Sequence, residues 1–154
     1  MKNTEFTVKM LKKSEDRSII YSIKKIEDAC FSDPWTLSSI EKEFDNKISQ
    51  WFIAYKNDVV AGYLLSWSVA GECDLLKLAV DEENRCKGVG RRLLESLIRD
   101  LRENDCEAVH LEVRESNVSA IRLYESVGFS KVGFRKDYYP DNNETALLFT
   151  RILK

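Results

Sequence analysis

The sequence predicts an α+β (mixed α/β) fold, in which a mixed, mostly antiparallel sheet is flanked by helices. Some segments are continuously apolar or alternate apolar and polar residues, as strands do, and others carry apolar residues at helical spacing. Along the chain these segments follow the order β-α-α-β-β-β-α-β-α-β-β. Strands that follow one another directly favour antiparallel pairing, and the βαβ connections of the second half require crossovers.

The first half of the chain supplies three predicted strands and two helices. Residues 5–11 alternate apolar and polar side chains, which predicts a strand. Residues 14–31 carry apolar residues at helical spacing, with Ser14 as N-cap, and Thr36 caps a short helix that ends near Phe44. Strands at 50–55 and 59–69 follow, joined by a tight turn at 56–58.

The second half alternates strands and helices before it ends in two strands. Residues 74–80 predict a strand, and the helix after it carries leucines on one face as far as about residue 101. A strand at 107–113 precedes a helix at 117–129, for which Asn117 is the N-cap and Gly128 provides the left-handed stop. Strands near 129–137 and 144–153 complete the chain.

Composition limits the classes of protein that the chain can belong to. Its 154 residues, 44 % of them apolar, fit a single domain spanning 1–154. A formal net charge of −2 argues against a general nucleic-acid-binding protein, and no apolar run approaches the ~20 residues that span a bilayer. The four cysteines lack the spacing of a zinc site. Because the N-terminus has no apolar signal core, we expect reduced thiols and a cytoplasmic location.

A basic glycine loop lies between the strand at 74–80 and the next helix. Arg85, Lys87 and Arg91 surround Gly88 and Gly90 at a helix start, which already carries partial positive charge. This arrangement indicates a cradle for an anion such as a phosphate. The loop has neither the Gly-Lys-Ser/Thr of a P-loop nor the third glycine of the dinucleotide fingerprint. The alternative is an ordinary turn with solvated charges.

The loop, with the order R-x-x-G-x-G directly after "KLAV", resembles that of the GCN5-related N-acetyltransferase (GNAT) family. The resemblance implies that the loop binds the pyrophosphate of acetyl-CoA and that the preceding strand binds its pantetheine arm. The implied coenzyme-binding residues are Leu78, Ala79, Val80, Arg85, Cys86, Lys87, Gly88, Val89, Gly90, Arg91 and Asn117. Asn117 can act as helix cap at the same time. No metal is implied.

Three further segments resemble the RimI type of this family, the ribosomal-protein alanine N-acetyltransferases. They are "FSDPW" at 31–35, "LEVRESNVSAIRLYESVGF" at 111–129 and "RKDYYP" at 135–140. The resemblance implies that acetyl-CoA transfers its acetyl group to the N-terminal α-amine of a small-subunit ribosomal protein. It implies no nucleic-acid or membrane partner, and a monomer or weak dimer.

Glu112 and Tyr124 are the catalytic residues that the resemblance implies. Glu112 would deprotonate the acceptor amine, and Tyr124 would give a proton to the departing thiolate. An α-amine, with a reference pKa of ~7.7–8.0, is short of its neutral form at pH 7 by about one unit, against over three units for lysine at ~10.4. A modest base therefore suffices for an α-amine. The alternatives are a polar strand face for Glu112 and a core aromatic for Tyr124.

Four residues are predicted to contact the acceptor: Trp35, Lys77, Tyr138 and Tyr139. Trp35 is a groove wall or core residue, and the tyrosines line the groove or pack as a strand pair. Lys77 departs from the family pattern, which has asparagine at this place, and Glu82 and Asn84 depart ahead of the loop. The single histidine of the chain, His110, is predicted to be structural or to lie on the surface.

Two other functions compete with this prediction. The same fold could acetylate a lysine, a polyamine or a small-molecule amine, and Lys77 leaves room for such an acceptor. The chain could also be a non-catalytic module that binds acyl-CoA, although the presence of both Glu112 and Tyr124 argues against that function.

Overall fold

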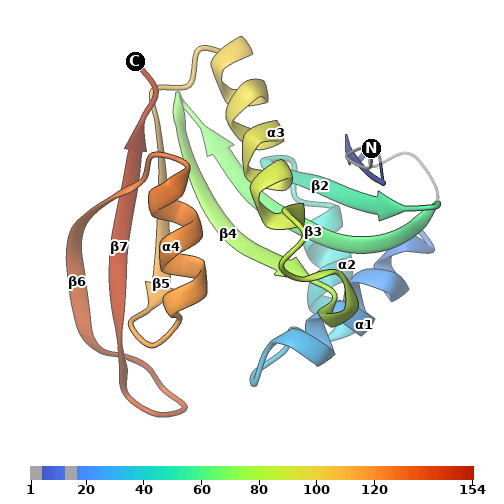
Figure 1. Cartoon of the computed structure of the whole chain (residues 1–154), viewed down its shortest axis with the longest axis horizontal. Coiled ribbons are helices and arrows are strands. Elements are labelled where there is room, and N and C mark those ends of the chain that lie inside the picture. The colour runs from blue at the N-terminus through green and yellow to red at the C-terminus, as the bar shows by residue number, and fades with distance from the viewer. Residues whose placement is uncertain (1–4, 13–16) are drawn as a thin grey trace.

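The structure, a computed structural model, describes residues 5–12 and 17–154. The elements follow the predicted order, with one short 3₁₀ helix added before α3 (Figure 1). In chain order they are β1 (Phe6–Met10), α1 (Ile19–Cys30), α2 (Leu37–Phe44), β2 (Ser49–Lys56), β3 (Val59–Val69), β4 (Glu72–Val80), the 3₁₀ helix (Glu82–Asn84), α3 (Val89–Glu103), β5 (Ala108–Arg114), α4 (Val118–Ser126), β6 (Ser130–Tyr139) and β7 (Glu144–Ile152).

Helix ends agree with the predicted caps wherever the structure describes them. The Thr36 hydroxyl accepts a hydrogen bond from the Ser39 N–H at 3.1 Å, and the Asn117 side chain accepts one from the Ala120 N–H at 3.3 Å. Gly128 follows α4 with a φ of +96°, the left-handed stop. Ser14, the predicted cap of the first helix, lies outside the described residues. Residues 17–18 form a turn, so the described helix α1 begins at Ile19.

One sheet contains all the strands, in the order β1-β2-β3-β4-β5-β7-β6. Every neighbouring pair is antiparallel except β4 and β5, which are parallel. That parallel pairing is short, because it joins Glu72–Leu75 to Ala108–Leu111 and goes no further. The register against β3 also shifts here: Ser66 pairs with Leu75 but Leu65 pairs with Lys77. Leu76 is therefore an extra residue, and such a bulge bends a strand away from its straight course.

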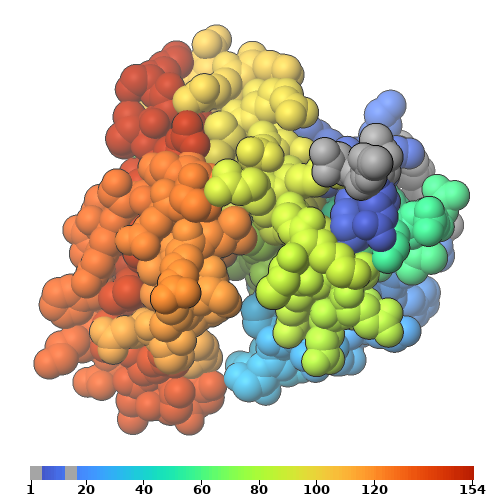
Figure 2. Space-filling model, in the orientation of Figure 1, coloured from blue at the N-terminus to red at the C-terminus, as the bar shows by residue number. Residues whose placement is uncertain are grey.

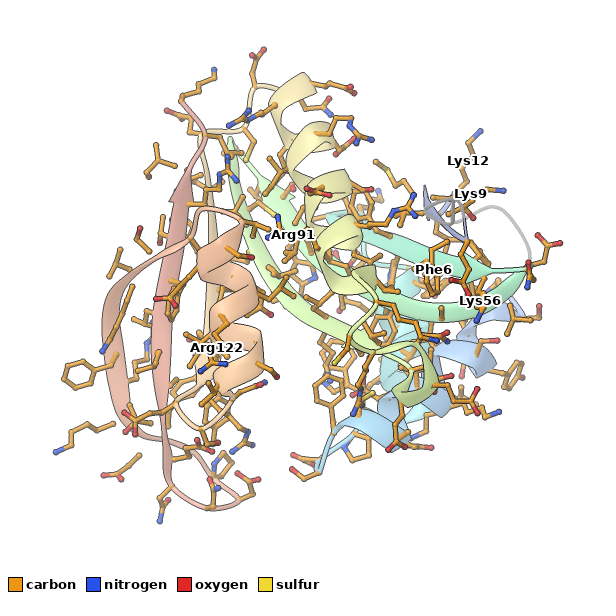
Figure 3. All side chains as sticks on the ribbon, in the orientation of Figure 1. Phe6, Lys9, Lys12, Lys56, Arg91 and Arg122 are labelled. Atoms are coloured by element: carbon orange, nitrogen blue, oxygen red, sulfur yellow. The ribbon has the colours of Figure 1, made fainter. Side chains whose placement is uncertain are left out.

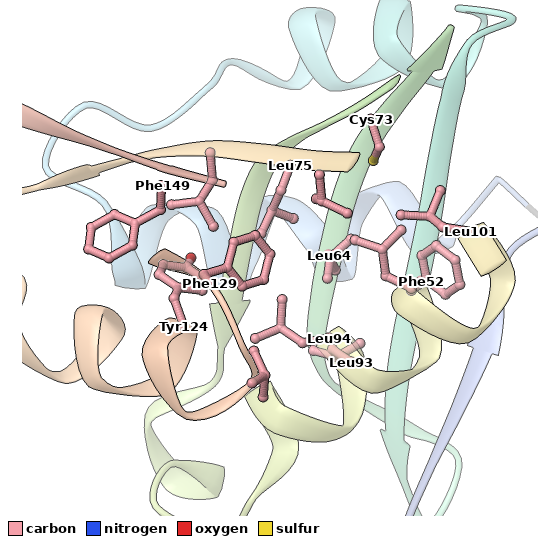
Figure 4. Packing of buried hydrophobic residues seen from close by; sticks show 14 of the residues in the cluster. Phe52, Leu64, Cys73, Leu75, Leu93, Leu94, Leu101, Tyr124, Phe129 and Phe149 are labelled. Atoms are coloured by element: carbon pink, nitrogen blue, oxygen red, sulfur yellow. The ribbon is translucent and has the colours of Figure 1, made fainter. Parts of the chain in front are cut away.

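Helices pack on both faces of the sheet, with a core on each side (Figure 1). Helices α3 and α4 cover one face, where Leu93, Leu94 and Tyr124 belong to the larger core (Figure 4). Helices α1 and α2 cover the other face, over β2, β3 and β4, where Trp51 and Tyr63 are buried. The β5 face that carries Glu112 lies outside this second core. The predicted α+β class is confirmed.

Candidate active site

A gap opens in the sheet where β4 and β5 part. From Lys77 to Val80, β4 pairs with β3 but has no partner in β5. The corresponding end of β5, from Glu112 to Arg114, pairs only with β7. The backbone edges that face each other across this gap are free of ladder hydrogen bonds, so they can bind an extended ligand. Figure 2 shows the surface hollowed here, between α4 in orange and the loop before α3 in green.

The glycine loop leads from the end of β4 into α3 and presents backbone donors to this gap. Gly88 is the N-cap of α3, with a φ of +83°, and no described side chain caps the helix. Since the first turn of a helix has unpaired N–H groups, an anion is the natural cap. A Cβ on Gly88 would meet nothing within 4 Å, so its backbone conformation, and not space, requires glycine.

Gly90 is required for another reason, because it lies where α3, α4 and β4 approach closely. A Cβ at this position would come within 3.0 Å of the Leu123 Cδ2 atom. Leu78 and Val80 are the next neighbours, at 3.9 and 4.0 Å. The two glycines of the loop thus have different roles. Gly88 allows a left-handed turn, and Gly90 allows close packing at the start of α3.

The cations of the loop differ in where they point. Arg91 turns toward α4, where its guanidinium donates to the Ser126 hydroxyl at 2.8 Å (Figure 3). Arg85 turns back onto β4, donating to the Val80 carbonyl at 3.1 Å and to the Cys30 sulfur at 3.2 Å. Lys87 is exposed. Arg85 is therefore bonded to β4, whereas Lys87 and Arg91 lie near the start of α3 and are not bonded to that strand.

Glu112 lies on the face of β5 that points away from α4. Leu111 and Val113, on either side of it, are buried in the core under α3 and α4. The Tyr138 hydroxyl donates to one Glu112 oxygen at 2.9 Å, and the Arg135 Nε lies 3.9 Å from the other. The Glu112 side chain keeps 37 % of its surface exposed. A carboxylate so placed is held in position yet open to solvent and to an incoming amine.

Tyr124 approaches the gap from the opposite face of the sheet. Its ring packs edge-on against Phe129, with centroids 5.8 Å apart, and 8 % of the residue is exposed. No described residue hydrogen-bonds its hydroxyl in the structure, and that oxygen is not fully enclosed. Burial, with a smaller contribution from Tyr139, raises the Tyr124 pKa above its ordinary value. The phenol therefore stays protonated at neutral pH with its donor unused.

Lys77 stands on β4 just beyond the Leu76 bulge, on the face covered by α1. Its ammonium pairs with the Glu27 carboxylate. It also lies over two aromatic rings of the loop between α1 and α2, 4.3 Å from the centroid of Phe31 and 4.6 Å from that of Trp35. Trp35 is half-buried and packs against the second core, so its role as a core residue or as a groove wall stays a prediction.

Tyr138 and Tyr139 end β6 next to Glu112. Tyr138 and Tyr139 pack edge to face at 5.2 Å, and the Arg114 guanidinium lies 4.0 Å from the centre of the Tyr139 ring. The register between β6 and β7 shifts between Arg135 and Tyr139, which lets Tyr138 reach Glu112. The two tyrosines thus pack on each other, and their contact with an acceptor stays a prediction.

A loop contact closes this side of the gap. The Ser32 hydroxyl, before Trp35, donates to an Asp141 oxygen at 3.4 Å, and Asp141 in turn pairs with Arg114 at 3.1 Å. The loop between α1 and α2 and the loop between β6 and β7 therefore meet over the open face. The contact thus borders the face of the sheet on which Glu112 lies.

Sequence reasoning missed Glu27, Phe31 and Arg135. Glu27 is 1 % exposed, and it lies on the apolar face of α1 beside Ile23 and Ile26. A carboxylate on the buried face of an amphipathic helix was a signal that it has a polar partner. Its partner Lys77, by contrast, is fifty residues distant in the sequence, and no local pattern joins the two.

Two other features lie apart from the gap. A pocket of about 650 Å³ lies between α3 and the end of α4, and shares only Arg91 with the glycine loop. His110, in β5, contacts the Thr150 hydroxyl at 2.8 Å and a Glu72 carboxylate oxygen at 2.9 Å, and its side chain is partly exposed. Cys86 is exposed, and all four cysteines are free. The described residues contain no cluster of metal-binding side chains. Among them, no helix has the length and apolar character to cross a bilayer.

The parted strands, the glycine loop and Tyr124 of α4 lie together at one gap in the sheet, and comparison with known proteins shows the family. The model of the Acetyltransferase (GNAT) family matches residues 20–129, so the chain belongs to the GNAT family. It is an acetyl-CoA-dependent N-acetyltransferase.

Individual members of the family and solved structures are similar to the chain over most of its length. The chain is 35 % identical over 128 residues to the [ribosomal protein bS18]-alanine N-acetyltransferase of Escherichia coli K12, covering 80 % of this chain and 84 % of that protein. The crystal structure of the E. coli ribosomal-protein-S18-alanine N-acetyltransferase is similar with a TM-score of 0.87, at 29 % identity and with 97 % and 94 % of the two chains covered. Ard1 from Thermoplasma volcanium gives a TM-score of 0.86 at 25 % identity, with 98 % and 99 % covered.

Proposed function

We propose that this protein acetylates the N-terminal α-amine of ribosomal protein bS18, at an N-terminal alanine, by direct attack of that amine on acetyl-CoA. The observation that carries the proposal is the sheet gap, which has Glu112 on one face and Tyr124 on the other. The names of the relatives support the acceptor. We further propose a single domain over 1–154, a monomer or weak dimer, and action in the cytoplasm, where ribosomal proteins are made.

The glycine loop and the free edge of β4 fit acetyl-CoA. Uncapped N–H groups at the start of α3, with Lys87 and Arg91 beside them, suit the pyrophosphate. The unpaired β4 edge at Leu78–Val80 suits the amide groups of the pantetheine arm. Arg85 would act by holding the end of β4, since it already donates to the Val80 carbonyl. The coenzyme supplies a thioester, whose carbonyl carbon accepts the amine and whose thiolate leaves.

Glu112 is proposed as the base that prepares the amine. It lies on the acceptor side of the sheet, and it is exposed enough to reach the amine directly or through one water. An α-amine needs about 1.4 kcal/mol to lose its proton at pH 7, whereas a lysine needs roughly 4–5 kcal/mol. A carboxylate that stays partly solvated suits the first task better than the second.

Tyr124 is proposed as the donor to the leaving sulfur. It reaches the gap from the coenzyme side, and its hydroxyl has no partner among the described residues. Because burial raises its pKa, complete transfer of the proton to a thiolate costs more than the reference values imply. The phenol therefore acts first as a hydrogen-bond donor that stabilises charge on sulfur, and gives up its proton only late.

The acceptor class is the part of the proposal that a direct experiment decides. Peptides that copy the bS18 N-terminus are incubated with acetyl-CoA, one with a free α-amine and one with that amine blocked and a lysine side chain free. We expect one acetyl group on the free α-amine by tandem mass spectrometry, and none on the lysine. Acetylation of the lysine peptide alone would assign the enzyme to the competing class that acts on side-chain or small-molecule amines.

A further inference from the structure

A buried carboxylate, that of Glu27, holds Lys77 and the loop that carries Trp35 in place. Glu27 is 1 % exposed, and its oxygens accept hydrogen bonds from the Tyr63 hydroxyl, the Lys77 ammonium and the Trp35 backbone N–H, the last at 2.8 Å. Glu27, on α1, is thus joined to β3, to β4 and to the loop between α1 and α2. Burial and the Glu27 charge raise the Tyr63 pKa, so the phenol is a fixed donor.

The surroundings of the Lys77 ammonium are those of a cation site. A carboxylate and two aromatic faces, from Phe31 and Trp35, surround it at centroid distances of 4.3 and 4.6 Å. Carboxylates and aromatic faces are the groups that proteins use to bind ammonium ligands. The Lys77 side chain is 13 % exposed, so it fills this site and is nearly enclosed by it.

The position of the site ties it to the acceptor. Lys77 is the second residue after the end of the β4–β5 pairing, and it faces the side of the sheet on which Glu112 lies. Phe31 and Trp35 belong to the same loop as Ser32, whose hydroxyl contacts Asp141 of the loop between β6 and β7. A buried ion pair is weak evidence for stability, since desolvation offsets much of the attraction. A role in recognition accounts better for its place.

We propose that Lys77 is a specificity-determining residue, an internal ligand that fills a cation site formed by Glu27, Phe31 and Trp35. This inference rests on the proposed function, because it concerns the first side chain of an acceptor peptide. With the site filled, a first residue with a small side chain fits beside Lys77. A large or cationic first side chain is excluded, since its space and its counter-charge are already taken.

The binding half of the proposal is tested without acetyl-CoA. Lys77→Ala removes the part of the side chain that n-propylammonium replaces, and the indole N–H of Trp35 reports on the site by NMR. We expect a saturable shift of this signal on addition of n-propylammonium to Lys77→Ala, and none with the wild type. If the variant folds and shows no saturable shift, the cation site is refuted.

A second variant keeps the proposal testable if Lys77→Ala fails to fold with Glu27 unpaired. Lys77→Ala combined with Glu27→Gln leaves a neutral hole of the same shape. We expect this double variant to accept large apolar first residues but not to bind n-propylammonium. The matched control is Lys131→Ala, which removes another lysine that lies over an aromatic ring, Phe134, at the outer edge of the sheet.

The specificity half compares kcat/KM for peptides that begin with alanine, leucine or lysine. We expect the leucine-to-alanine ratio to rise by about tenfold or more in both Lys77 variants, the gain that a freed apolar pocket can give. The lysine-to-alanine ratio should rise only where Glu27 remains. Unchanged ratios with active enzyme overturn the inference alone. If the wild type acetylates no α-amine at all, the proposed function fails, and the n-propylammonium titration still decides the cation site.

Discussion

At the scale of single residues, the proposed chemistry depends on two side chains on opposite faces of the sheet, Glu112 of β5 and Tyr124 of α4. Glu112 and Leu111 are neighbours in sequence, but strand alternation sends Leu111 into the core with Tyr124 and Glu112 to the open face. A base and a donor separated in this way act on opposite sides of the thioester. In the proposed mechanism the base meets the amine and the donor meets the sulfur, so neither neutralises the other.

Replacing Glu112 by glutamine tests the base. The amide keeps the size of the side chain and can still accept from Tyr138, but it cannot take a proton. We expect kcat to fall by about 10²-fold or more, the usual contribution of a general base, with coenzyme affinity unchanged by calorimetry. Tyr138→Phe is the matched control, because it removes only the hydrogen bond to Glu112 at 2.9 Å. Wild-type turnover in Glu112→Gln would refute the assignment.

The pH profile tests Tyr124. The rate should rise with pH as the α-amine loses its proton near ~7.7–8.0. Because burial raises the Tyr124 pKa above the ordinary value of 10.0, no fall in rate is expected below about pH 10. Tyr124→Phe keeps the ring against Phe129 and should lower kcat at every pH while the profile keeps its rising limb. A falling limb near pH 9 in the wild type would show that another group supplies the proton.

The glycine loop is the decisive feature at the scale of elements. Gly88 adopts a φ of +83° in open space, so Gly88→Ala meets no atom and costs only the left-handed conformation, about 1–2 kcal/mol. We expect this loss in chemical denaturation, together with a higher KM for acetyl-CoA, because the first turn of α3 is displaced. Gly133→Ala is the control, since its Cβ would make an ordinary contact of 3.6 Å with Leu148. Equal effects of the two changes would contradict the loop's role.

Element-scale features are also those that the sequence predicts best. Strand alternation and helical spacing depend on neighbours in sequence, and so do the caps at Thr36 and Asn117. The Leu76 bulge and the early end of the β4–β5 pairing depend on β3 and β5, which local patterns do not encode. For the same reason the pairing of Lys77 with Glu27, fifty residues away, could not be predicted. The proposed roles of Glu112 and Tyr124 came from family resemblance, because either residue alone reads as an ordinary strand or core position.

Buried protons link pH to stability at the scale of the whole molecule. Burial raises the pKa of the Cys73 thiol from 9.0 to about 12. Because the pKa is higher in the folded chain, the folded thiol still holds its proton at pH values between the two pKa values, where the unfolded thiol has lost it. Its contribution to stability is therefore complete below about pH 9 and is lost as pH rises toward about 12.

Urea unfolding at several alkaline pH values measures this effect. We expect the unfolding free energy to fall by about 1.4 kcal/mol per pH unit above the unfolded thiol pKa, with Tyr63 and Tyr124 adding to the fall at higher pH. Cys73→Ala should reduce the slope between pH 9 and 10, whereas Cys86→Ala, at an exposed thiol, should leave it unchanged. The same slope in both variants would show that the Cys73 proton is not retained on folding.

The central claim concerns the whole molecule: acetyl transfer takes place in the gap between β4 and β5, with the coenzyme on the α4 side and the peptide on the Lys77 side. A crystal structure with a conjugate of coenzyme A and a bS18 N-terminal peptide, joined through an acetyl bridge, tests it most directly. We predict the bridge between the two strand edges, with the sulfur toward Tyr124 and the peptide nitrogen toward Glu112. A conjugate bound elsewhere, such as the pocket between α3 and the end of α4, or bound with the two directions reversed, would contradict the account.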